Sequence, residues 1–209
     1  MSALSGFDRP FALAIAALGG FALSVQLFLF VQTQLTQGGT AAWALVLYFG
    51  YYTILTNLFC VIVALAIVQR PAAESRWNGW RQPWVISAAA VSILLVGVIF
   101  HLLLRHEYQP TGISAVTNVI HHYLIPAAFT FLWWRVVPRS ALTFGDVPRI
   151  VAYPFAYLVY ILFRGEVTGL YPYFFIDVSR IGYSAALINA GAISLLFILV
   201  SCLFVAGKR

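Results

Sequence analysis

The sequence has 209 residues, of which 62% are hydrophobic and 9% are charged, and its mean hydropathy is +0.92. Soluble domains are usually about 45–50% apolar and about 25% charged, so this composition excludes a soluble globular protein and predicts an integral membrane protein. The net charge of +6 is the kind expected from basic residues that flank membrane spans, and it gives no reason to predict nucleic-acid binding.

Six apolar runs separated by short polar segments predict an all-α fold, with six transmembrane helices in a single domain. A helix needs about 20 apolar residues to cross the hydrocarbon core of a bilayer. The spans are expected at about residues 11–33, 41–68, 83–104, 114–137, 149–164 and 178–206. The first run is longer than the apolar region of a signal peptide, about 7–15 residues, so we expect it to be retained.

The distribution of basic residues predicts how these helices are oriented. Short cytoplasmic loops carry an excess of lysine and arginine. With the N-terminus inside, nine of the twelve basic residues fall on the inner side: Arg9, Arg70, Arg76, Arg81, Arg135, Arg139, Arg149, Lys208 and Arg209. The outer side keeps only Arg105, Arg164 and Arg180. We therefore expect both termini to be cytoplasmic.

Polar side chains recur at helical spacing inside the second and fourth spans. The two sets, each spaced i, i+3 and i+4, are Thr53, Thr56 and Asn57 in the second span and Asn118, His121 and His122 in the fourth. At 1.5 Å per residue, Thr53 lies roughly 18 Å and His122 roughly 12 Å below the outer boundary. Lipid offers these groups no hydrogen-bond partner, so the two faces are expected to point at one another inside the bundle.

The histidine pair is the most unusual part of this polar set. An imidazole at this depth is costly and normally faces a protein interior or a water-filled cavity, so it indicates a functional site by default. Neighbouring residues on a helix point about 100° apart, so His121 and His122 cannot both face the same partner. One of them is expected to act on a ligand while the other packs or orients it.

Part of the polar set is also explained by helix packing. Asparagine and threonine commonly hydrogen-bond between membrane helices, which would account for Thr56, Asn57 and Asn118. The fifth span carries a further stripe of polar residues, which are Tyr153, Tyr157, Tyr160 and Arg164. Its tyrosines fit packing and hydroxyl bonding. Arg164 fits either a side chain that extends to the interface or a site that attracts a carboxylate or phosphate head group.

Nucleophilic catalysis is the first chemistry that these residues permit. A threonine hydroxyl becomes a nucleophile when a base within hydrogen-bond reach accepts its proton, and Thr53 and His122 have comparable expected depths. No aspartate or glutamate lies deep in any span. The group that orients the histidine would therefore be Asn118, a tyrosine, or an outer-loop residue such as Asp177.

Two further chemistries use the histidines as ligands. Haem could be held between helices by His101 together with His121 or His122. Zinc could bind the same three histidines, but adjacent ligands on one helix diverge, and we rank this reading last. Cys60 and Cys202 lie in apolar runs and predict neither a disulfide nor a metal motif. We expect no cofactor and no metal.

Several motifs together resemble a known family. The segment Tyr51-Tyr52-Thr53-Ile54-Leu55-Thr56-Asn57 looks like Phe/Tyr-Thr-x-x-Ser/Thr-Asn, and Asn118, His122 and Pro126 look like Asn-x-x-x-His-x-x-x-Pro. A Tyr-Pro, Arg-Gly and Tyr-Pro-Tyr-x-Phe-x-Asp signature is matched by Tyr153-Pro154, Arg164-Gly165 and Tyr171-Pro172-Tyr173-Phe174-Phe175-Ile176-Asp177. Over about residues 48–189 the chain is similar to the bacterial six-span branch related to the androgen-induced and androgen-dependent membrane proteins of animals.

This resemblance implies a multi-pass hydrolase with an essential threonine and an essential histidine in the membrane. The animal members cleave fatty-acid esters of hydroxy fatty acids. Carried onto this chain, Thr53 corresponds to the nucleophile and His122 to its base. The spacing from histidine to proline differs from the animal form, so His121 remains a rival base. Asn57, Asn118 or a tyrosine hydroxyl would donate to the developing oxyanion.

The sequence therefore favours an intramembrane lipid esterase that uses a threonine nucleophile and a histidine base on fatty-acyl esters. Its expected partners are membrane lipids, and acyl chains would enter sideways from the bilayer. Its cavity is expected between the second and fourth spans, in the extracytoplasmic half of a bacterial inner membrane. The alternative is a non-catalytic protein that binds or transports a lipid or small molecule in the same cavity.

Overall fold

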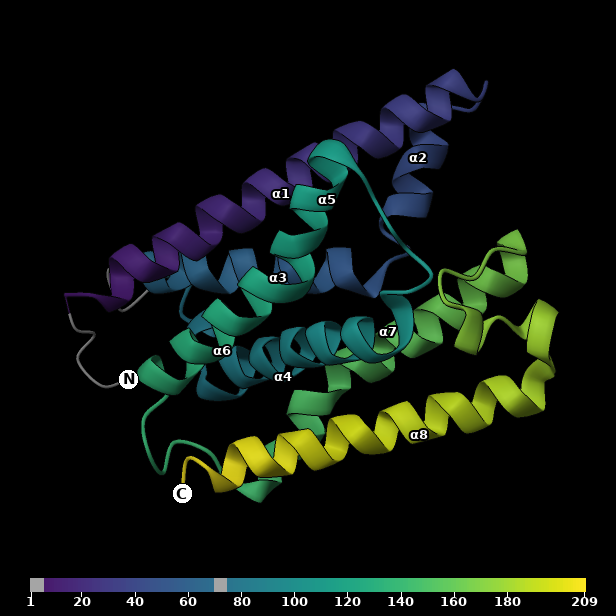
Figure 1. Cartoon of the computed structure of the whole chain (residues 1–209). Helices are drawn as coiled ribbons and strands as arrows, with labels where there is room; N and C mark the ends of the chain where they lie inside the picture. Colours follow the sequence, from purple (N-terminus) through teal and green to yellow (C-terminus); the bar gives the residue numbers. More distant parts are fainter. Residues whose placement is uncertain (1–5, 70–74) are drawn as a thin grey trace.

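The computed structural model describes residues 6–69 and 75–209, and these residues form helices joined by turns, with no strand among them (Figure 1). Five helices are long and apolar enough to cross a membrane, or six if a bent pair counts as one span. The α-helices are α1 (Asp8–Thr36), α2 (Ala41–Tyr48), α3 (Tyr52–Val68), α4 (Pro83–Ile99), α5 (Gly112–Val119), α6 (Ile125–Val136), α7 (Val147–Thr168) and α8 (Val178–Ala206). Short 3₁₀ turns cover Gly79–Arg81, Phe144–Asp146 and Phe174–Ile176, and π turns cover Phe100–Leu104 and Ile120–Leu124.

Helix α4 forms the centre of the bundle. In its most apolar stretch 67% of the residues are buried inside the protein, against 28% for α1 and for α8. Figure 1 shows α4 running between α1 on one side and α8 on the other, and it packs on α3, α6, α7 and α8. The outward surfaces of α1 and α8 are apolar and exposed, as expected of helices that face lipid.

Both ends of the described chain lie at the same end of the bundle. Asp8, at the start of α1, forms an ion pair with Arg135 near the end of α6, with 2.7 Å between Oδ1 and Nε. Lys208, just after α8, donates a hydrogen bond to the carbonyl of Trp134. Arg70, one of the basic residues predicted on the inner side, lies outside the described residues.

The second predicted span, expected as one helix over residues 41–68, is instead two helices. α2 and α3 meet at a bend of 81°, and the break falls at Phe49–Tyr51. The backbone of Tyr51 is extended (φ −86°, ψ 125°), so α3 begins afresh at the next residue. The break places the N-terminus of α3 inside the bundle, where the N–H groups of a first helical turn have no partners within their own helix.

Side chains of α7 stabilise this break. The hydroxyls of Tyr157 and Tyr160 donate to the carbonyls of Gly50 and Phe49, at 2.8 and 3.4 Å. The Arg164 guanidinium packs against Gly50, where a Cβ would lie 2.6 Å from Nη1. Carbonyls released by a broken membrane helix need partners inside the protein, and the predicted polar stripe of the fifth span supplies them.

The predicted span 114–137 is a helix from 112 to 136 with a widened π turn at Ile120–Leu124. Pro126 has no N–H to donate, and its ring would collide with the carbonyl of the residue four positions earlier, which is His122. A wider turn relieves that collision. Gly97 of α4 packs directly against this turn, because a Cβ there would lie 2.9 Å from the His122 carbonyl oxygen.

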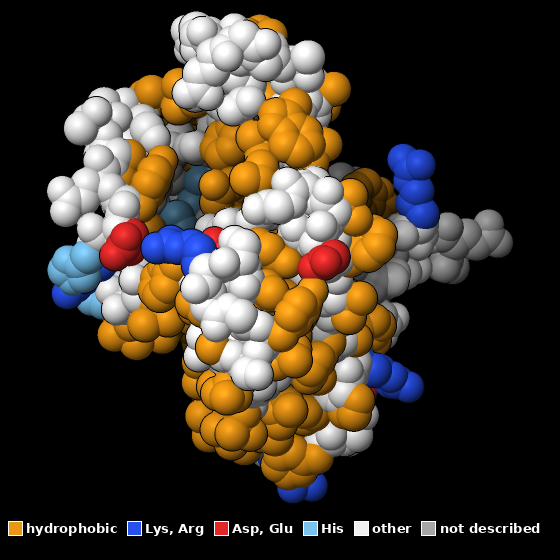
Figure 2. Space-filling view, turned by 90° about the vertical axis from the view of Figure 1, so that its right-hand side faces the viewer, with side chains coloured by type: hydrophobic (Ala, Val, Ile, Leu, Met, Phe, Trp, Pro, Cys, Tyr) orange, Lys and Arg blue, Asp and Glu red, His pale blue; other side chains and the backbone are white. Residues whose placement is uncertain are grey.

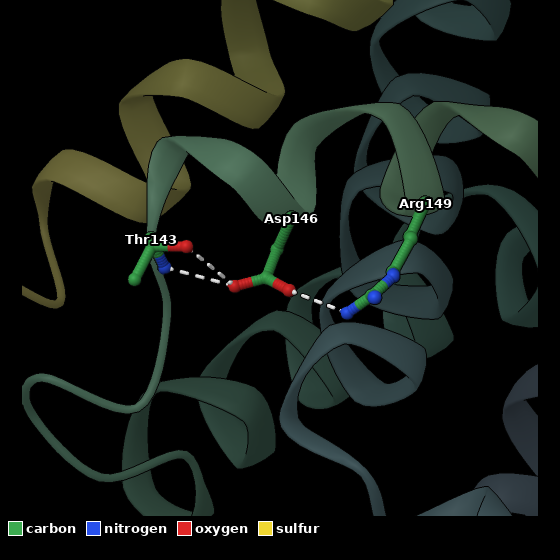
Figure 3. Close-up of polar contacts among 3 residues, drawn as sticks. All are labelled: Thr143, Asp146 and Arg149. Carbon is green, nitrogen blue, oxygen red and sulfur yellow. Dashed lines mark hydrogen bonds and ion pairs between the residues drawn. The ribbon is translucent and has the colours of Figure 1, made fainter.

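Helix α7 is longer than the 16-residue span expected at 149–164, since it has 22 residues. A capping box precedes it, in which the N–H and hydroxyl of Thr143 both donate to Asp146, each at 3.0 Å, and Asp146 also accepts from Arg149 at 3.3 Å (Figure 3). At its other end the helix continues through Gly165, the residue directly after the end of the expected span. The helix stops at Gly169, whose φ of 71° is a left-handed conformation that glycine adopts without strain.

Candidate functional site

Thr53 of α3 and His122 of the π turn lie within hydrogen-bonding distance of each other. Thr53 Oγ1 is 3.3 Å from Nε2 of His122, although the two residues are 69 positions apart in the sequence. Thr53 is the second residue of α3, directly after the break, and both side chains are half-buried. The break and the π turn thus position the hydroxyl and the imidazole that the sequence singled out as a nucleophile and its base.

The second ring nitrogen fixes the tautomer of His122. Nδ1 lies 3.0 Å from the carbonyl oxygen of Asn118. A carbonyl can only accept, so Nδ1 carries the proton, and Nε2 presents its lone pair to the hydroxyl of Thr53. The ring is further held by stacking on Phe100, with 3.7 Å between centroids. The imidazole is therefore oriented as a general base for Thr53.

The group that orients the histidine is the main-chain carbonyl of Asn118. The sequence singled out Asn118, a tyrosine or an outer-loop residue such as Asp177, without indicating which group of Asn118 would act. Asp177 instead caps α8, where its carboxylate accepts from the N–H and the hydroxyl of Ser179, at 3.1 and 2.5 Å. Within residues 6–69 and 75–209, no carboxylate bonds to His122.

A cavity of about 370 Å³ lies beside the Thr53–His122 pair. Its polar lining includes Gln26, Asn118, His121, His122, Asp177 and Arg180. Figure 2 looks onto the end of the bundle that carries residues 105–111 and 169–177, and it shows histidine atoms deep in a hollow with acidic and basic side chains near its mouth. The pair is therefore reachable from this end of the protein.

A second, smaller cavity of about 90 Å³ meets the first at Thr53. Its walls are mostly apolar and come from α4, α7 and α8, with Val96, Leu158, Ala190, Ile193 and Phe197 among them. Thr53, Leu104 and Tyr173 line both cavities. The hydroxyl thus lies where a polar space and an apolar space join.

His121 lies in the wall of the larger cavity, and Asn57 is fully buried beside it. His121 is only 3% exposed and lines the larger cavity, and neither of its ring nitrogens has a hydrogen-bond partner of ordinary geometry among the described residues. The amide nitrogen of Asn57 donates to the carbonyls of Thr53 and His121, at 2.8 and 3.4 Å. Asn57 therefore ties α3 to the π turn and so fixes the distance between the two helices at the reactive pair.

Several of the singled-out residues, among them Thr56, Tyr160 and Arg164, line neither cavity. Thr56 is fully buried, with its hydroxyl 3.0 Å from that of Tyr153. Tyr160 and Arg164 support the helix break, and Arg164 also donates from Nη1 to the Leu170 carbonyl at 3.4 Å. Arg164 is thus buried behind the site, away from where a ligand head group would enter.

The structure adds two residues that the sequence did not single out. Tyr173 accepts a hydrogen bond from the N–H of Tyr52, at 2.9 Å, and lines both cavities. Arg180 is the cation that lines the larger cavity. Tyr173 belonged to the Tyr-Pro-Tyr motif and Arg180 to the small set of outer basic residues, so each carried a signal that could have been followed.

The structure does not bring together the histidines that were considered as haem or zinc ligands. His101 is exposed, with Nδ1 3.3 Å from the Tyr123 hydroxyl and Nε2 3.1 Å from Arg105, so it does not face His121 or His122. The described part of the chain holds no group of three or more His, Cys, Asp or Glu residues that could bind a metal ion.

No protein-family model, no curated protein and no solved structure matches the chain. What the fold and the site define is an all-helical protein whose helices can cross a membrane, with a threonine–histidine pair at the junction of two cavities. A function must therefore be inferred from the geometry of this pair.

Proposed function

We propose that this protein is an intramembrane lipid esterase that uses Thr53 as its nucleophile and His122 as its general base. The main support is the 3.3 Å contact between Thr53 Oγ1 and His122 Nε2, in a tautomer that leaves Nε2 free to accept the proton. A hydroxyl, a base and an orienting acceptor in this order are the requirements for an activated nucleophile. The same two residues match the essential threonine and histidine of the family that the sequence resembles.

The proposed topology has six spans, with the broken α2–α3 pair as the second, and both termini in the cytoplasm of a bacterial inner membrane. The shared end of the two termini and the excess of basic residues expected there support this orientation. The larger cavity then opens on the extracytoplasmic side, between the links at residues 105–111 and 169–177.

The acylation step follows from the geometry. Thr53 Oγ1 attacks the ester carbonyl carbon while its proton passes to Nε2 of His122. The carbon–oxygen bond to the alcohol then breaks, and the imidazolium returns this proton to the departing oxygen. During this step the Asn118 carbonyl, which accepts from Nδ1, stabilises the positive charge on the ring.

Hydrolysis of the acyl-threonine uses the same base. Water from the larger, partly polar cavity gives a proton to His122 and attacks the acyl carbon. The bond to Thr53 Oγ1 breaks, Thr53 recovers a proton from His122, and a fatty acid leaves. The two cavities would separate the parts of the substrate: the carbonyl end of the acyl chain would enter the apolar space between α4, α7 and α8, and the alcohol would enter the polar one.

Covalent labelling tests the proposal. The purified protein is expected to form a one-to-one adduct with a fluorophosphonate probe, and peptide mass spectrometry should locate the adduct on Thr53. Thr53→Ala should abolish labelling. Thr56→Ala is the matched control, because the Thr56 hydroxyl faces Tyr153 and lines neither cavity, so labelling should persist.

The opposite outcomes contradict the proposal. Labelling that survives in Thr53→Ala would exclude Thr53 as the nucleophile. Saturable lipid binding that tolerates Thr53→Ala, with no ester turnover by the unmodified protein, would instead indicate a non-catalytic lipid-binding or transport protein.

The small cavity predicts a chain-length effect. Ala190 of α8 lines it and is 5% exposed, so Ala190→Leu should fill space intended for the acyl chain. Hydrolysis of a palmitoyl ester is expected to fall by about tenfold or more relative to a butyryl ester, the scale of selectivity that a methylene-sized change in an apolar pocket gives. Ala192→Leu, on the exposed side of the same helix, is the control and should leave the ratio unchanged. An unchanged ratio in Ala190→Leu would indicate that the acyl chain binds in the other cavity.

A further inference from the structure

We propose that Tyr173 is a third catalytic residue, whose hydroxyl donates the hydrogen bond that stabilises the oxyanion of the tetrahedral intermediate. This inference rests on the proposed esterase function. Ester cleavage at Thr53 places negative charge on the former carbonyl oxygen, and donors aimed at that position are usually the largest single contribution to such catalysis. The amide of Asn57, one candidate donor near the pair, is already engaged by main-chain carbonyls.

The two asparagines near the pair differ in what they can offer. The amide nitrogen of Asn57 is already shared between two main-chain carbonyls, those of Thr53 and His121. Asn118 lines the cavity, but it bonds to His122 through its main chain, and its buried side-chain oxygen has no donor. The Asn57 amide, as placed, therefore does not donate into the space between Thr53 and the cavities.

The Tyr173 hydroxyl has the required position. It lies at the N-terminus of α3, accepts from the Tyr52 N–H at 2.9 Å, and contacts both the N–H and the hydroxyl of Thr53. It is also one of the three residues that line both cavities. An ester carbonyl carbon within reach of Thr53 Oγ1 therefore has its oxygen beside this hydroxyl.

The hydroxyl also has the required hydrogen. The hydrogen bond from the Tyr52 N–H uses a lone pair of the phenol oxygen, so the phenol proton can turn from the neighbouring Thr53 hydroxyl to a substrate oxygen. Burial raises the pKa of Tyr173 to about 12, which keeps the phenol protonated at neutral pH. Donation from the amides of α3 into the phenol oxygen makes its O–H a stronger donor, because hydrogen bonds in a chain polarise one another. The positive end of the helix thus acts on the oxyanion through Tyr173.

The Tyr173 ring is fixed by aromatic packing and needs no substrate to hold it in place. It stacks on Phe175, with 5.3 Å between centroids and an angle of 2°, and meets Tyr51 edge-on at 6.2 Å. Tyr173→Phe keeps these contacts and removes only the hydroxyl, which makes it a clean test.

Kinetics and inhibitor binding distinguish this role from a structural one. Tyr173→Phe is expected to lower kcat by about 10²–10³-fold, as loss of an oxyanion donor does, with KM little changed. A long-chain trifluoromethyl ketone, which adds the Thr53 hydroxyl to form an oxyanion-bearing hemiketal, should bind more weakly by the same factor. The matching methyl ketone, which stays unreacted, should bind about as tightly as before. Replacement of Tyr173 by 3-fluorotyrosine, which keeps the hydroxyl, should restore activity.

Tyr183→Phe is the control, since the Tyr183 hydroxyl bonds to Glu166 and the residue lines neither cavity; its activity should be unchanged. Equal weakening of both ketones in Tyr173→Phe, or unchanged kcat, would overturn the role of Tyr173 while leaving the esterase intact. A protein that neither hydrolyses esters nor forms the hemiketal before any substitution would instead overturn the proposed function itself.

Discussion

Replacement of His122 by glutamine is expected to lower the rate of ester hydrolysis by about 10²–10⁴-fold, the usual contribution of a positioned general base. Glutamine can still offer a hydrogen-bonding group to the Thr53 hydroxyl, but it cannot accept the proton that leaves Thr53 Oγ1. The loss should therefore appear in kcat, and KM should change little, because the walls of both cavities remain. Steady-state kinetics on a soluble fatty-acyl ester would measure both constants.

His121→Gln provides the comparison that separates the two adjacent histidines. His121 lines the cavity, but its ring nitrogens form no hydrogen bond of ordinary geometry among the described residues, and Thr53 Oγ1 pairs with His122. The loss in His121→Gln should therefore be much smaller than in His122→Gln. Added imidazole should partly restore His122→Ala, since the cavity is large enough to admit it. The reverse ranking of the two variants would make His121 the base.

The membrane helices could be predicted from the sequence because their signal is local. The last span was expected at residues 178–206 and is Val178–Ala206 in the structure, with a kink at Gly182 (φ 75°, ψ 162°). The third was expected at 83–104, where α4 and its π turn run from Pro83 to Leu104. Each of these runs has the length and hydropathy of a bilayer-crossing helix, and neither needs a contact with another element to be recognised.

The break after α2 could not be predicted in the same way, because its causes are distant in the sequence. Residues 41–68 form one mostly apolar run whose only helix-disfavouring residue of the Gly or Pro type is Gly50. What stabilises the bend is the pair of tyrosine hydroxyls and the guanidinium of α7, more than a hundred positions later in the case of Tyr157. The spacing of these residues could be recognised in the sequence as a polar stripe. The sequence did not indicate to which carbonyls they would donate.

The candidate site was likewise predictable where the signal was local and unpredictable where it depended on distant contacts. Depth and helical spacing placed Thr53 and His122 on facing helices, and the structure brings their side chains to 3.3 Å. The carbonyl of Asn118 escaped prediction because every residue has a carbonyl and only the fold selects one. The place of Tyr173 in the site could not be predicted, because it depends on how the link at residues 169–177 folds back over α3.

The contact of that link with Gly165 of α7 is expected to be the part of the fold most sensitive to a single added methyl group. A Cβ on Gly165 would lie 2.1 Å from Cε1 of the Tyr171 ring, far inside contact distance. Gly165→Ala gains about 1 kcal/mol of helix propensity. The forced displacement of a packed aromatic ring costs about 1–3 kcal/mol, so the net effect should be destabilising. Gly191→Ala, in α8 with nothing within 4 Å of the new Cβ, is the control and should be neutral or stabilising.

The effect of Gly165→Ala should reach the active site, because Tyr171 and Tyr173 are two residues apart on the same link. Moving the Tyr171 ring is expected to shift the Tyr173 hydroxyl away from the Tyr52 N–H, so kcat should fall together with the unfolding temperature in detergent. Tyr171→Ala introduced into Gly165→Ala gives the added methyl group room, so the double variant should lose less stability than the sum of the two single variants. Strictly additive losses would show that the ring and the glycine do not act on one another, and that some other contact positions the link over α3.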